Sequence, residues 1–329
     1  MEKSKKSAGA LIGEYGAFLA LVLLVAVISV ISPDFRTASN FLSLLRQASF
    51  NGLIAFGMTC VILSDGIDLS VGSTFALSAI ICAEMLIKGF PAFVAIIVAL
   101  IAGTILGMIS GILVTKGRLQ PFIATLITMT AYRGLALIIT NGKPVSKLAA
   151  SIESKSGAFL FKALGKGNLE FGPAESPWFS IPIPVIILVL ALIVFWFILH
   201  KTTFGRRVYA TGSNAKCANL VGVNTSRIKI AVYAISGFLS ALAGLIMISR
   251  LDSAQPTLGS GYELDAIAAV ALGGTSMSGG RGKIIGTCAG VLIIAVLNNG
   301  MNILGVNSYY QDVIKAVVIL VAVLSDRKR

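Results

Sequence analysis

The stretch "SDGIDLSVGS", residues 64–73, places two carboxylates and two glycines between two apolar runs. "FGMTCVIL" precedes it and "TFALSAIICA" follows it. Carboxylates are costly to bury in apolar surroundings, and glycine lets the backbone leave a helix. The stretch therefore predicts an interruption between two apolar helices.

The composition disfavours a soluble globular protein. Hydrophobic residues make up 56% of the 329 residues, charged residues make up 12%, and the mean hydropathy is +0.90. One soluble core could not hide that much apolar surface. The sequence predicts an all-α polytopic membrane protein. The predicted spans leave no room for a soluble domain, so we expect residues 1–329 to form a single transmembrane domain.

A membrane span needs roughly 20 mainly apolar residues. By that criterion the chain has about ten candidate transmembrane helices, of which the second and the eighth are short. Their approximate limits are residues 14–32, 48–64, 70–88, 91–115, 119–140, 183–200, 228–249, 261–275, 284–304 and 309–325.

The basic residues indicate which ends of these helices face the cytoplasm. If the N-terminus is cytoplasmic, ten spans return the C-terminus there, and sixteen Lys and Arg residues fall inside against nine outside. The other two, Arg133 and Lys315, fall within spans. This excess agrees with the positive-inside rule. We expect cytoplasmic termini, an extracytoplasmic loop at residues 141–182 and a basic cytoplasmic loop at residues 201–229.

Polar side chains in or beside the spans are the strongest pointers to function, because they are expensive in lipid and usually face a cavity or one another. The set consists of Asp65, Asp68, Glu84, Arg133, Glu263, Asp265, Asn298, Asn299, Asn302, Asp312 and Lys315. The spacing of Asp312 and Lys315 also suits a simple ion pair on one helix face. Asp68 could likewise act only as an N-cap of the third helix.

Two sets of glycines recur at every fourth residue. They are Gly103, Gly107 and Gly111 in the fourth span, and Gly282, Gly286 and Gly290 at the start of the ninth. Small residues at that interval let helix backbones approach closely in lipid. We expect both sets to pack helices within a compact bundle, with a contact between subunits as a further option.

Several kinds of site are disfavoured. "GGTSMSGGRGK", residues 273–283, has Met277 where a P-loop needs glycine, and Ile284 follows it where Ser or Thr is needed. The single histidine and four dispersed cysteines indicate neither a catalytic set nor a metal site. The net charge of +13 reflects basic residues at the ends of apolar runs. We expect no metal, no cofactor, no nucleic acid and no catalysis by this chain.

Four stretches resemble a known family. They are "NGLIAFGMTCVILSDGIDLSVGS", "GRLQPFIATLITM", "SAQPTLGSGYELDAIAAVALGGTSMSGGRGKIIGT" and "LNNGMNILGVNSYYQDVIKAVVILVAVL". They closely resemble the membrane subunits of bacterial ABC sugar importers, the ribose, xylose, arabinose and galactoside permease family. Residues 66–72 and 273–286 match the signature stretches of that family. The likeness runs from the first span to the C-terminus.

The resemblance implies an ATP-driven sugar importer in the bacterial inner membrane. Its permease would pair with a second copy of itself, with a cytoplasmic ABC ATPase subunit and with an extracytoplasmic sugar-binding protein. Overall likeness favours D-ribose as the sugar. Sugar hydroxyls need hydrogen-bond partners in a membrane, which amide side chains supply. The expected substrate path is formed by Asp65, Asp68, Ser70, Asn298 and Asn299, with Asp65 and Asp68 organising a helix break near the cytoplasmic gate.

The cytoplasmic loop also aligns with the coupling segment of the family, which carries Glu-Ala-Ala ahead of a glycine. Here Ala215-Lys216-Cys217 and Gly222 take those places, so the acid is missing. The residues 214–222, "NAKCANLVG", predict a short helix that presents a surface to a partner. The residues expected to couple to the ATPase are Arg207, Asn214, Lys216, Gly222 and Asn224.

The main alternative is a proton-coupled secondary sugar transporter, with an intramembrane carboxylate as the proton carrier. A channel would need a selectivity filter, and a membrane enzyme would need a catalytic set. The sequence shows neither pattern.

Overall fold

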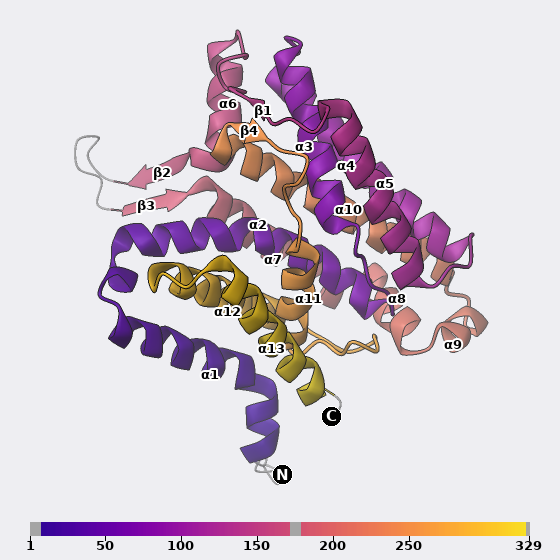
Figure 1. The fold of residues 1–329 in the computed structure, drawn as a ribbon. Helices are drawn as coiled ribbons and strands as arrows, with labels where there is room; N and C mark the ends of the chain where they lie inside the picture. Colours follow the sequence, from indigo (N-terminus) through magenta and orange to yellow (C-terminus); the bar gives the residue numbers. More distant parts are fainter. Residues whose placement is uncertain (1–7, 172–178, 327–329) are drawn as a thin grey trace.

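The computed structural model describes residues 8–171 and 179–326 (Figure 1). Within these residues, ten helices correspond to the ten predicted spans. They are α1 (Ala8–Ile31), α2 (Ala38–Leu63), α3 (Val71–Ile87), α4 (Ala92–Thr115), α5 (Pro121–Thr140), α7 (Ile183–Lys201), α10 (Thr225–Leu251), α11 (Tyr262–Leu272), α12 (Ile284–Ile303) and α13 (Ser308–Asp326). In the described part of the chain, five of them (α4, α5, α7, α10 and α12) are long and apolar enough to cross a membrane.

Short elements connect these helices. They are η1 (Asp34–Arg36), β1 (Val145–Ser146), α6 (Lys155–Lys166), β2 (Asn168–Phe171), β3 (Phe179–Pro182), α8 (Thr203–Ser213), α9 (Ala215–Leu220) and β4 (Ser253–Ala254). Strand β1 pairs antiparallel with β4, with Val145 opposite Ala254. Strand β2 pairs antiparallel with β3, with Leu169 opposite Ile181. The expected loop at residues 141–182 therefore has its own helix and strands, and its residues 172–178 lie outside the described residues.

Helices α2 and α11 differ from their expected spans in opposite directions. Helix α2 begins ten residues before the expected limit, because the hydroxyl of Thr37 caps it by accepting the backbone N–H of Asn40 at 3.3 Å. Helix α11 covers only residues 262–272. At a rise of 1.5 Å per residue it is about 16 Å long, roughly half of the hydrocarbon core of a bilayer. The non-helical residues 255–261 lead from β4 into it.

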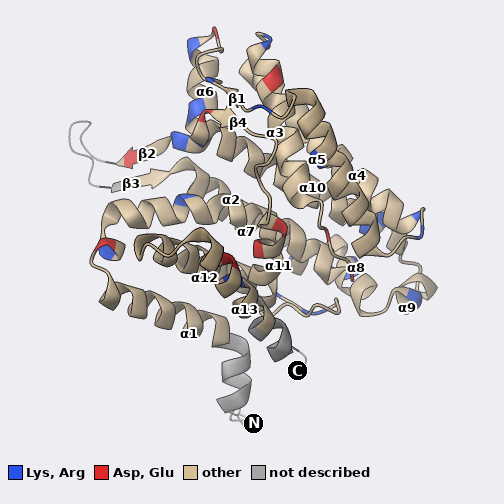
Figure 2. Cartoon of the chain, in the orientation of Figure 1, with Lys and Arg blue, Asp and Glu red and all other residues tan. Residues whose placement is uncertain are grey.

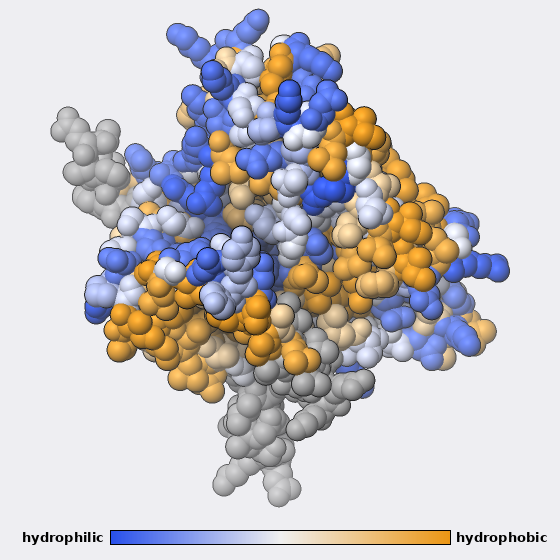
Figure 3. All heavy atoms as spheres, viewed as in Figure 1, coloured by the Kyte–Doolittle hydropathy of each residue, from blue (hydrophilic) through white to orange (hydrophobic). Residues whose placement is uncertain are grey.

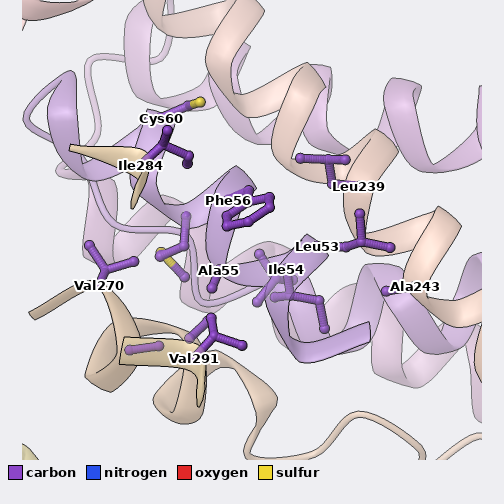
Figure 4. Packing of buried hydrophobic residues seen from close by; sticks show 14 of the residues in the cluster. Leu53, Ile54, Ala55, Phe56, Cys60, Leu239, Ala243, Val270, Ile284 and Val291 are labelled. Atoms are coloured by element: carbon purple, nitrogen blue, oxygen red, sulfur yellow. The ribbon is translucent and has the colours of Figure 1, made fainter. Parts of the chain in front are cut away.

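The helices form two packed groups that share α2 and α10. Helix α10 packs against α3 and α4, with α5 beside α3. Helix α2 packs against α7, α11 and α12, while α1 lies on α12 and α13 on α11. Figure 4 shows the apolar layers on the two sides of α2, where Leu53 of α2 lies near Leu239 of α10 and Val291 of α12 packs on the other side of α2.

Glycines set the closest helix contacts. A Cβ added at Gly107 of α4 would fall on the carbonyl oxygen of Tyr233 in α10, and Gly103 and Gly111 also face α10. On α12, Gly286 and Gly290 face the backbone at the end of α11 in the same way. Gly282 lies just before α12, against the side chain of Thr275. The structure thus places both glycine sets at tight approaches within one chain.

The outer surface is apolar over a broad zone. Large exposed apolar side chains include Val22 of α1, Ile101 of α4, Ile138 of α5 and Ile193 of α7. Figure 3 shows apolar residues gathered over α1 and over α4 and α5, with hydrophilic residues around α6. In Figure 2 charged residues gather near α6, β2 and α9, with acidic residues also beside α11. This distribution suits helices that face lipid between two polar ends.

Candidate functional site

The chain between α2 and α3 leaves the helix at polar residues. Asp65 adopts a left-handed conformation with φ of 60°, and its N–H donates to the carbonyl of Ile62 at 2.9 Å. Helix α3 begins at Val71. The interruption predicted between the two apolar helices is present, and we call residues 64–70 the α2–α3 break.

Asp68 is the buried centre of this break, with 1% of its surface exposed. Its carboxyl group accepts the N–H of Ser70 at 3.0 Å, the hydroxyl of Ser70 at 2.6 Å and the hydroxyl of Ser236 in α10 at 2.8 Å. The Ser70 hydroxyl lies 3.4 Å from that of Ser110 in α4, which donates to Thr128 in α5 at 3.0 Å. The carboxyl group therefore does more than cap α3, because it joins a polar chain across α10, α3, α4 and α5.

Asp65 has a different environment from Asp68. Its side chain is 62% exposed, and the Lys229 ammonium lies 4.0 Å from its carboxylate. The same ammonium donates to the carbonyl oxygen of Asp65 at 3.1 Å. An exposed ion pair contributes little stability, so the backbone contact is the firmer link between the break and α10.

Three segments meet at the end of α2. The N–H of Gly280 donates to the carbonyl oxygen of Leu63 at 3.0 Å. Gly212 of α8 packs on the same carbonyl, where an added Cβ would overlap it. The hydroxyl of Tyr209 in α8 donates to the carbonyl oxygen of Gly282 at 2.9 Å. We call these five residues the α2–α8 junction, which connects α8 directly to the end of α2 and to the glycine-rich loop at residues 273–283.

Helices α8 and α9 present an exposed surface beyond this junction. The side chain of Asn214 accepts the N–H of Cys217, and that of Asn224 accepts the N–H of Arg227, both at 3.0 Å. These contacts start α9 and α10, while Gly222, with φ of 86°, follows the end of α9. The five residues expected to couple to a partner are all exposed: Arg207, Asn214, Lys216, Gly222 and Asn224.

Two apolar residues at the end of α9 were not among those predicted. Leu220 is 87% exposed and Val221 is 79% exposed, the first and fourth highest values among the large exposed hydrophobic side chains of the described residues. They follow a polar segment in the loop at residues 201–229, which its basic residues predict to be exposed to water. That contrast between an aqueous loop and bare apolar side chains was the available signal.

The amides Asn298 and Asn299 lie in α12, away from the α2–α3 break. Asn299 and Asn40 exchange two hydrogen bonds through their side chains, at 3.1 and 2.8 Å. Asn40 is in the first turn of α2 and Leu63 is at its end, a separation of about 35 Å along the helix. The structure therefore does not bring Asn299 to Asp65, Asp68 and Ser70. Asn298 is buried, hydrogen-bonds the side chain of Asp265 and leaves its own Oδ1 without a partner.

A cavity of about 400 Å³ lies between the start of α11 and α13. It is lined by Ser260, Gly261, Tyr262, Leu264, Asp265, Asp312, Lys315 and Ala316, and we call it the α11–α13 cavity. The ammonium of Lys315 is 3.4 Å from the carboxylate of Asp312, as predicted for an ion pair on one helix face. It is also 3.8 Å from the carboxylate of Asp265, which the spacing of the sequence did not reveal.

The segment that leads into this cavity is fixed from α5. The guanidinium of Arg133 donates to the carbonyl oxygens of Pro256 and Leu258 at 2.5 and 2.8 Å. The carboxylate of Glu263 accepts the N–H of Gly261 at 3.2 Å. Irregular backbone between helices is thus held by charged side chains at points where no helical hydrogen bond is available.

Within residues 8–171 and 179–326, no three His, Cys, Asp or Glu side chains lie close enough together to hold a metal ion. The four cysteines are free, and they differ in exposure: Cys60 and Cys82 are buried, Cys288 is half-buried and Cys217 is exposed.

Comparison with known proteins agrees with these features. Residues 40–323 match the family described as the permease component of a branched-chain amino acid transport system. The ribose import permease of Bacillus subtilis (strain 168) is 51% identical over 95% of this chain and 92% of that protein. The ribose import permease of Haemophilus influenzae is 49% identical over 99% and 96%, and the L-arabinose permease of Escherichia coli (strain K12) is 37% identical over 99% and 94%. No solved structure matches the chain.

Members of this family are membrane components of bacterial ABC importers, which work with a separate ATPase subunit and a substrate-binding protein. As such a component, this chain is a multi-pass protein of the inner membrane and not itself an enzyme. It belongs to the ABC importer permease family that includes the ribose, arabinose and xylose permeases.

Proposed function

We propose that this chain is the membrane subunit of an ATP-driven D-ribose importer. Its identity to the two ribose permeases, 51% and 49%, exceeds its 37% identity to the arabinose and xylose permeases of Escherichia coli. That difference supports ribose as the transported sugar.

In the proposed orientation both termini and the loop at residues 201–229 are cytoplasmic, and the loop at residues 141–182 is extracytoplasmic. The excess of basic residues on the assigned cytoplasmic side supports it. The exposed surface of α8 and α9 then faces the ATPase. Residues 1–329 act as one transmembrane domain in this proposal.

The α2–α8 junction is the observation that carries the coupling mechanism. ATP binding and hydrolysis in the ATPase would move α8 and α9 through contacts with Arg207, Asn214, Lys216, Gly222 and Asn224. Helix α8 touches the last carbonyl group of α2 through Gly212, and Tyr209 holds the glycine-rich loop. A displacement of α8 would therefore reach the α2–α3 break without passing through a flexible connection.

The predicted substrate-path residues take different roles in this proposal. The hydrogen bonds of Asp68 and Ser70 are satisfied within the fold, so with Asp65 they shape the break near the cytoplasmic gate. Asn298 keeps an unpartnered amide oxygen, which suits a sugar hydroxyl. Asn299 would have to release Asn40 before it could bind sugar.

Two copies of the chain form the transport path in the proposed assembly. Helix α13 supports this pairing, because Tyr309 is 82% exposed, Val313 is 62% exposed and the side chain of Asp312 is 78% exposed. A carboxylate facing lipid is costly, whereas a second copy or a water-filled path between two copies would cover it.

Reconstitution tests the proposed function. The purified chain is incorporated into proteoliposomes with its cognate ATPase and binding protein, and uptake is measured across a panel of sugars. We expect ribose accumulation that requires ATP, is blocked by vanadate and exceeds that of arabinose and xylose. Accumulation by the chain alone, driven by a proton gradient and indifferent to nucleotide, would instead establish the secondary transporter.

A further inference from the structure

The α11–α13 cavity brings donors and acceptors together beside an interrupted helix. Asp265 and Tyr262 come from the first turn of α11, Asp312 and Lys315 from α13, and Ser260 from the non-helical segment that precedes α11. The hydroxyl of Ser260 is exposed to the cavity, and Gly261 turns the chain into α11 with φ of 85°. The volume of about 400 Å³ lies within the range of small-molecule sites.

The charged groups of the cavity are incompletely neutralised by one another. Lys315 lies between two carboxylates, at 3.4 Å from Asp312 and 3.8 Å from Asp265, distances longer than a good charge-assisted hydrogen bond. Two carboxylates oppose one ammonium, so the cavity favours a neutral ligand over an anionic one. Such groups within membrane helices usually mark a pathway for a polar substrate.

A second observation comes from the neighbouring helix. Asn298 of α12 is 6% exposed, contacts Asp265 and has no partner for its Oδ1. A buried amide oxygen without a partner loses free energy until a donor reaches it. Asn298 does not itself line the cavity, and its connection to the cavity is its hydrogen bond to Asp265.

The first turn of α11 is closed by its own hydrogen bonds. The N–H groups of Tyr262, Leu264 and Asp265 donate to the carbonyl oxygens of Gly259 and Gly261. The approach to this turn is rigid, because Arg133 holds the carbonyl groups of Pro256 and Leu258. The cavity is therefore a held arrangement of polar groups rather than a loose loop.

We infer that the α11–α13 cavity is a transit site for the unphosphorylated sugar, where Lys315, Asp265, Asp312 and Ser260 exchange hydrogen bonds with its hydroxyl groups. This inference rests on the proposed function. The site would reject sugar phosphates, because their charge repels two carboxylates. Water or the sugar would occupy it when a second copy covers α13.

Transport by cavity variants is the first test. Lys315→Met and Asp312→Asn are each introduced into the permease, which is assembled with its ATPase and binding protein. The amount of sugar transported per ATP hydrolysed is then measured. We expect a fall of about tenfold for Lys315→Met, the effect of losing one hydrogen bond to a charged group, while ATPase activity stays within about twofold. Lys88→Met is the matched control, because it removes the ion pair with Glu84 on α3 away from the cavity, and we expect no effect.

A charge swap separates binding from helix pairing. The double variant Asp265→Lys with Lys315→Asp keeps an ion pair between α11 and α13 but reverses its direction. If this variant restores wild-type transport, the ion pair only holds the helices together and the inference is overturned. If Lys315→Met fails to assemble with the ATPase, Asp312→Asn decides, since its exposed side chain supports little of the fold; unchanged transport by it overturns the inference.

Chemical labelling gives a readout that does not depend on transport. In a Cys217→Ser background, Ser260→Cys is treated with a water-soluble methanethiosulfonate in the assembled transporter, with and without millimolar ribose. We expect labelling that ribose slows at least threefold and that ribose 5-phosphate does not slow. If wild-type ATP-driven ribose uptake is intact, absence of labelling, or labelling at a rate that ribose leaves unchanged, overturns the inference that the cavity binds sugar. If the wild type shows no such uptake, the proposed function fails first and the inference falls with it.

Discussion

Asp68 carries a buried carboxyl group that accepts hydrogen bonds from three donors. Asp68→Ala would leave the N–H and hydroxyl of Ser70 and the hydroxyl of Ser236 without that acceptor. We expect a loss of about 3 kcal/mol in the free energy of unfolding, measured by thermal or denaturant unfolding in detergent. Asp65→Asn is the control, since its side chain is exposed and asparagine also tolerates the left-handed conformation of this residue, and it should change stability by about 0.5 kcal/mol or less. Equal effects of the two variants would contradict the assigned role.

Tyr209 links α8 to the glycine-rich loop through one hydrogen bond. Burial raises the pKa of its hydroxyl to about 12, so the group remains a donor at neutral pH. Since the folded-state pKa is raised, its contribution is full below the ordinary value near 10 and is lost as the pH rises through about 12.

We expect Tyr209→Phe to destabilise the chain by about 1 kcal/mol, equally at pH 6 and pH 8, and to lower sugar moved per ATP in the assembled transporter. Tyr309→Phe, at an exposed residue, is the control for the stability measurement. A destabilisation that differs between pH 6 and pH 8 would show that the hydroxyl titrates in this range and is not the donor described.

The sequence identifies which residues of the break are unusual but not what they contact. Two acids and two glycines between apolar runs predict the interruption. The donor from Ser236 lies 168 positions away along the chain, and serine is too common in membrane helices to mark it. Asn40, which pairs with Asn299, is 259 positions away from it, so no local pattern marks the pair. The chemistry of amides toward sugar hydroxyls therefore predicts a path through both Asn298 and Asn299.

Among the elements, apolar run length predicted the helices well and their ends less well. Residues 38–47 join α2 although they are partly polar, because a Thr37 cap outweighs the low hydropathy. Helix α11 has only eleven residues. Gly273 and Gly274 follow its end, and Arg133 holds the non-helical segment before its start. Hydropathy reports burial in lipid, and it does not report how protein side chains stabilise irregular backbone at the same depth.

The crossing of α4 and α10 depends on bare glycine backbones. Gly107→Ala would place a methyl group on the carbonyl oxygen of Tyr233, and the backbone of α10 cannot yield locally. We expect a loss of about 2 kcal/mol in detergent unfolding and less assembled transporter. Gly134→Ala in α5 is the matched control, because nothing lies within 4 Å of the added Cβ, and it should be neutral or slightly stabilising. Equal losses from both variants would show that the crossing is not glycine-limited.

For the whole molecule, the basic loops and apolar runs predicted a membrane bundle and a partner surface at residues 214–222, while the two exposed apolar side chains on that surface needed the structure. Leu220 and Val221 stand bare at the end of α9. We expect the double variant Leu220→Ser with Val221→Ser to weaken ATPase binding at least tenfold, because binding would no longer bury two apolar side chains. The measurement is copurification and the concentration dependence of ATPase-coupled uptake.

Phe159→Ser is the control for that pair, since Phe159 is 76% exposed on α6, in the loop assigned to the opposite side of the membrane. It should leave ATPase binding unchanged. Weaker binding in both variants would indicate a general loss of folding rather than a docking surface.

Cys217 is exposed, whereas Cys60 and Cys82 are buried and Cys288 is half-buried, so Cys217 is a native labelling site on α9. A nitroxide attached there, with Cys288 replaced to keep the signal clean, would yield dipolar distances between paired subunits by electron spin resonance. A narrow distance distribution that shifts between nucleotide-free and ATP-trapped transporter would reveal how far α9 travels during a cycle. A monomeric permease would give no dipolar signal at all.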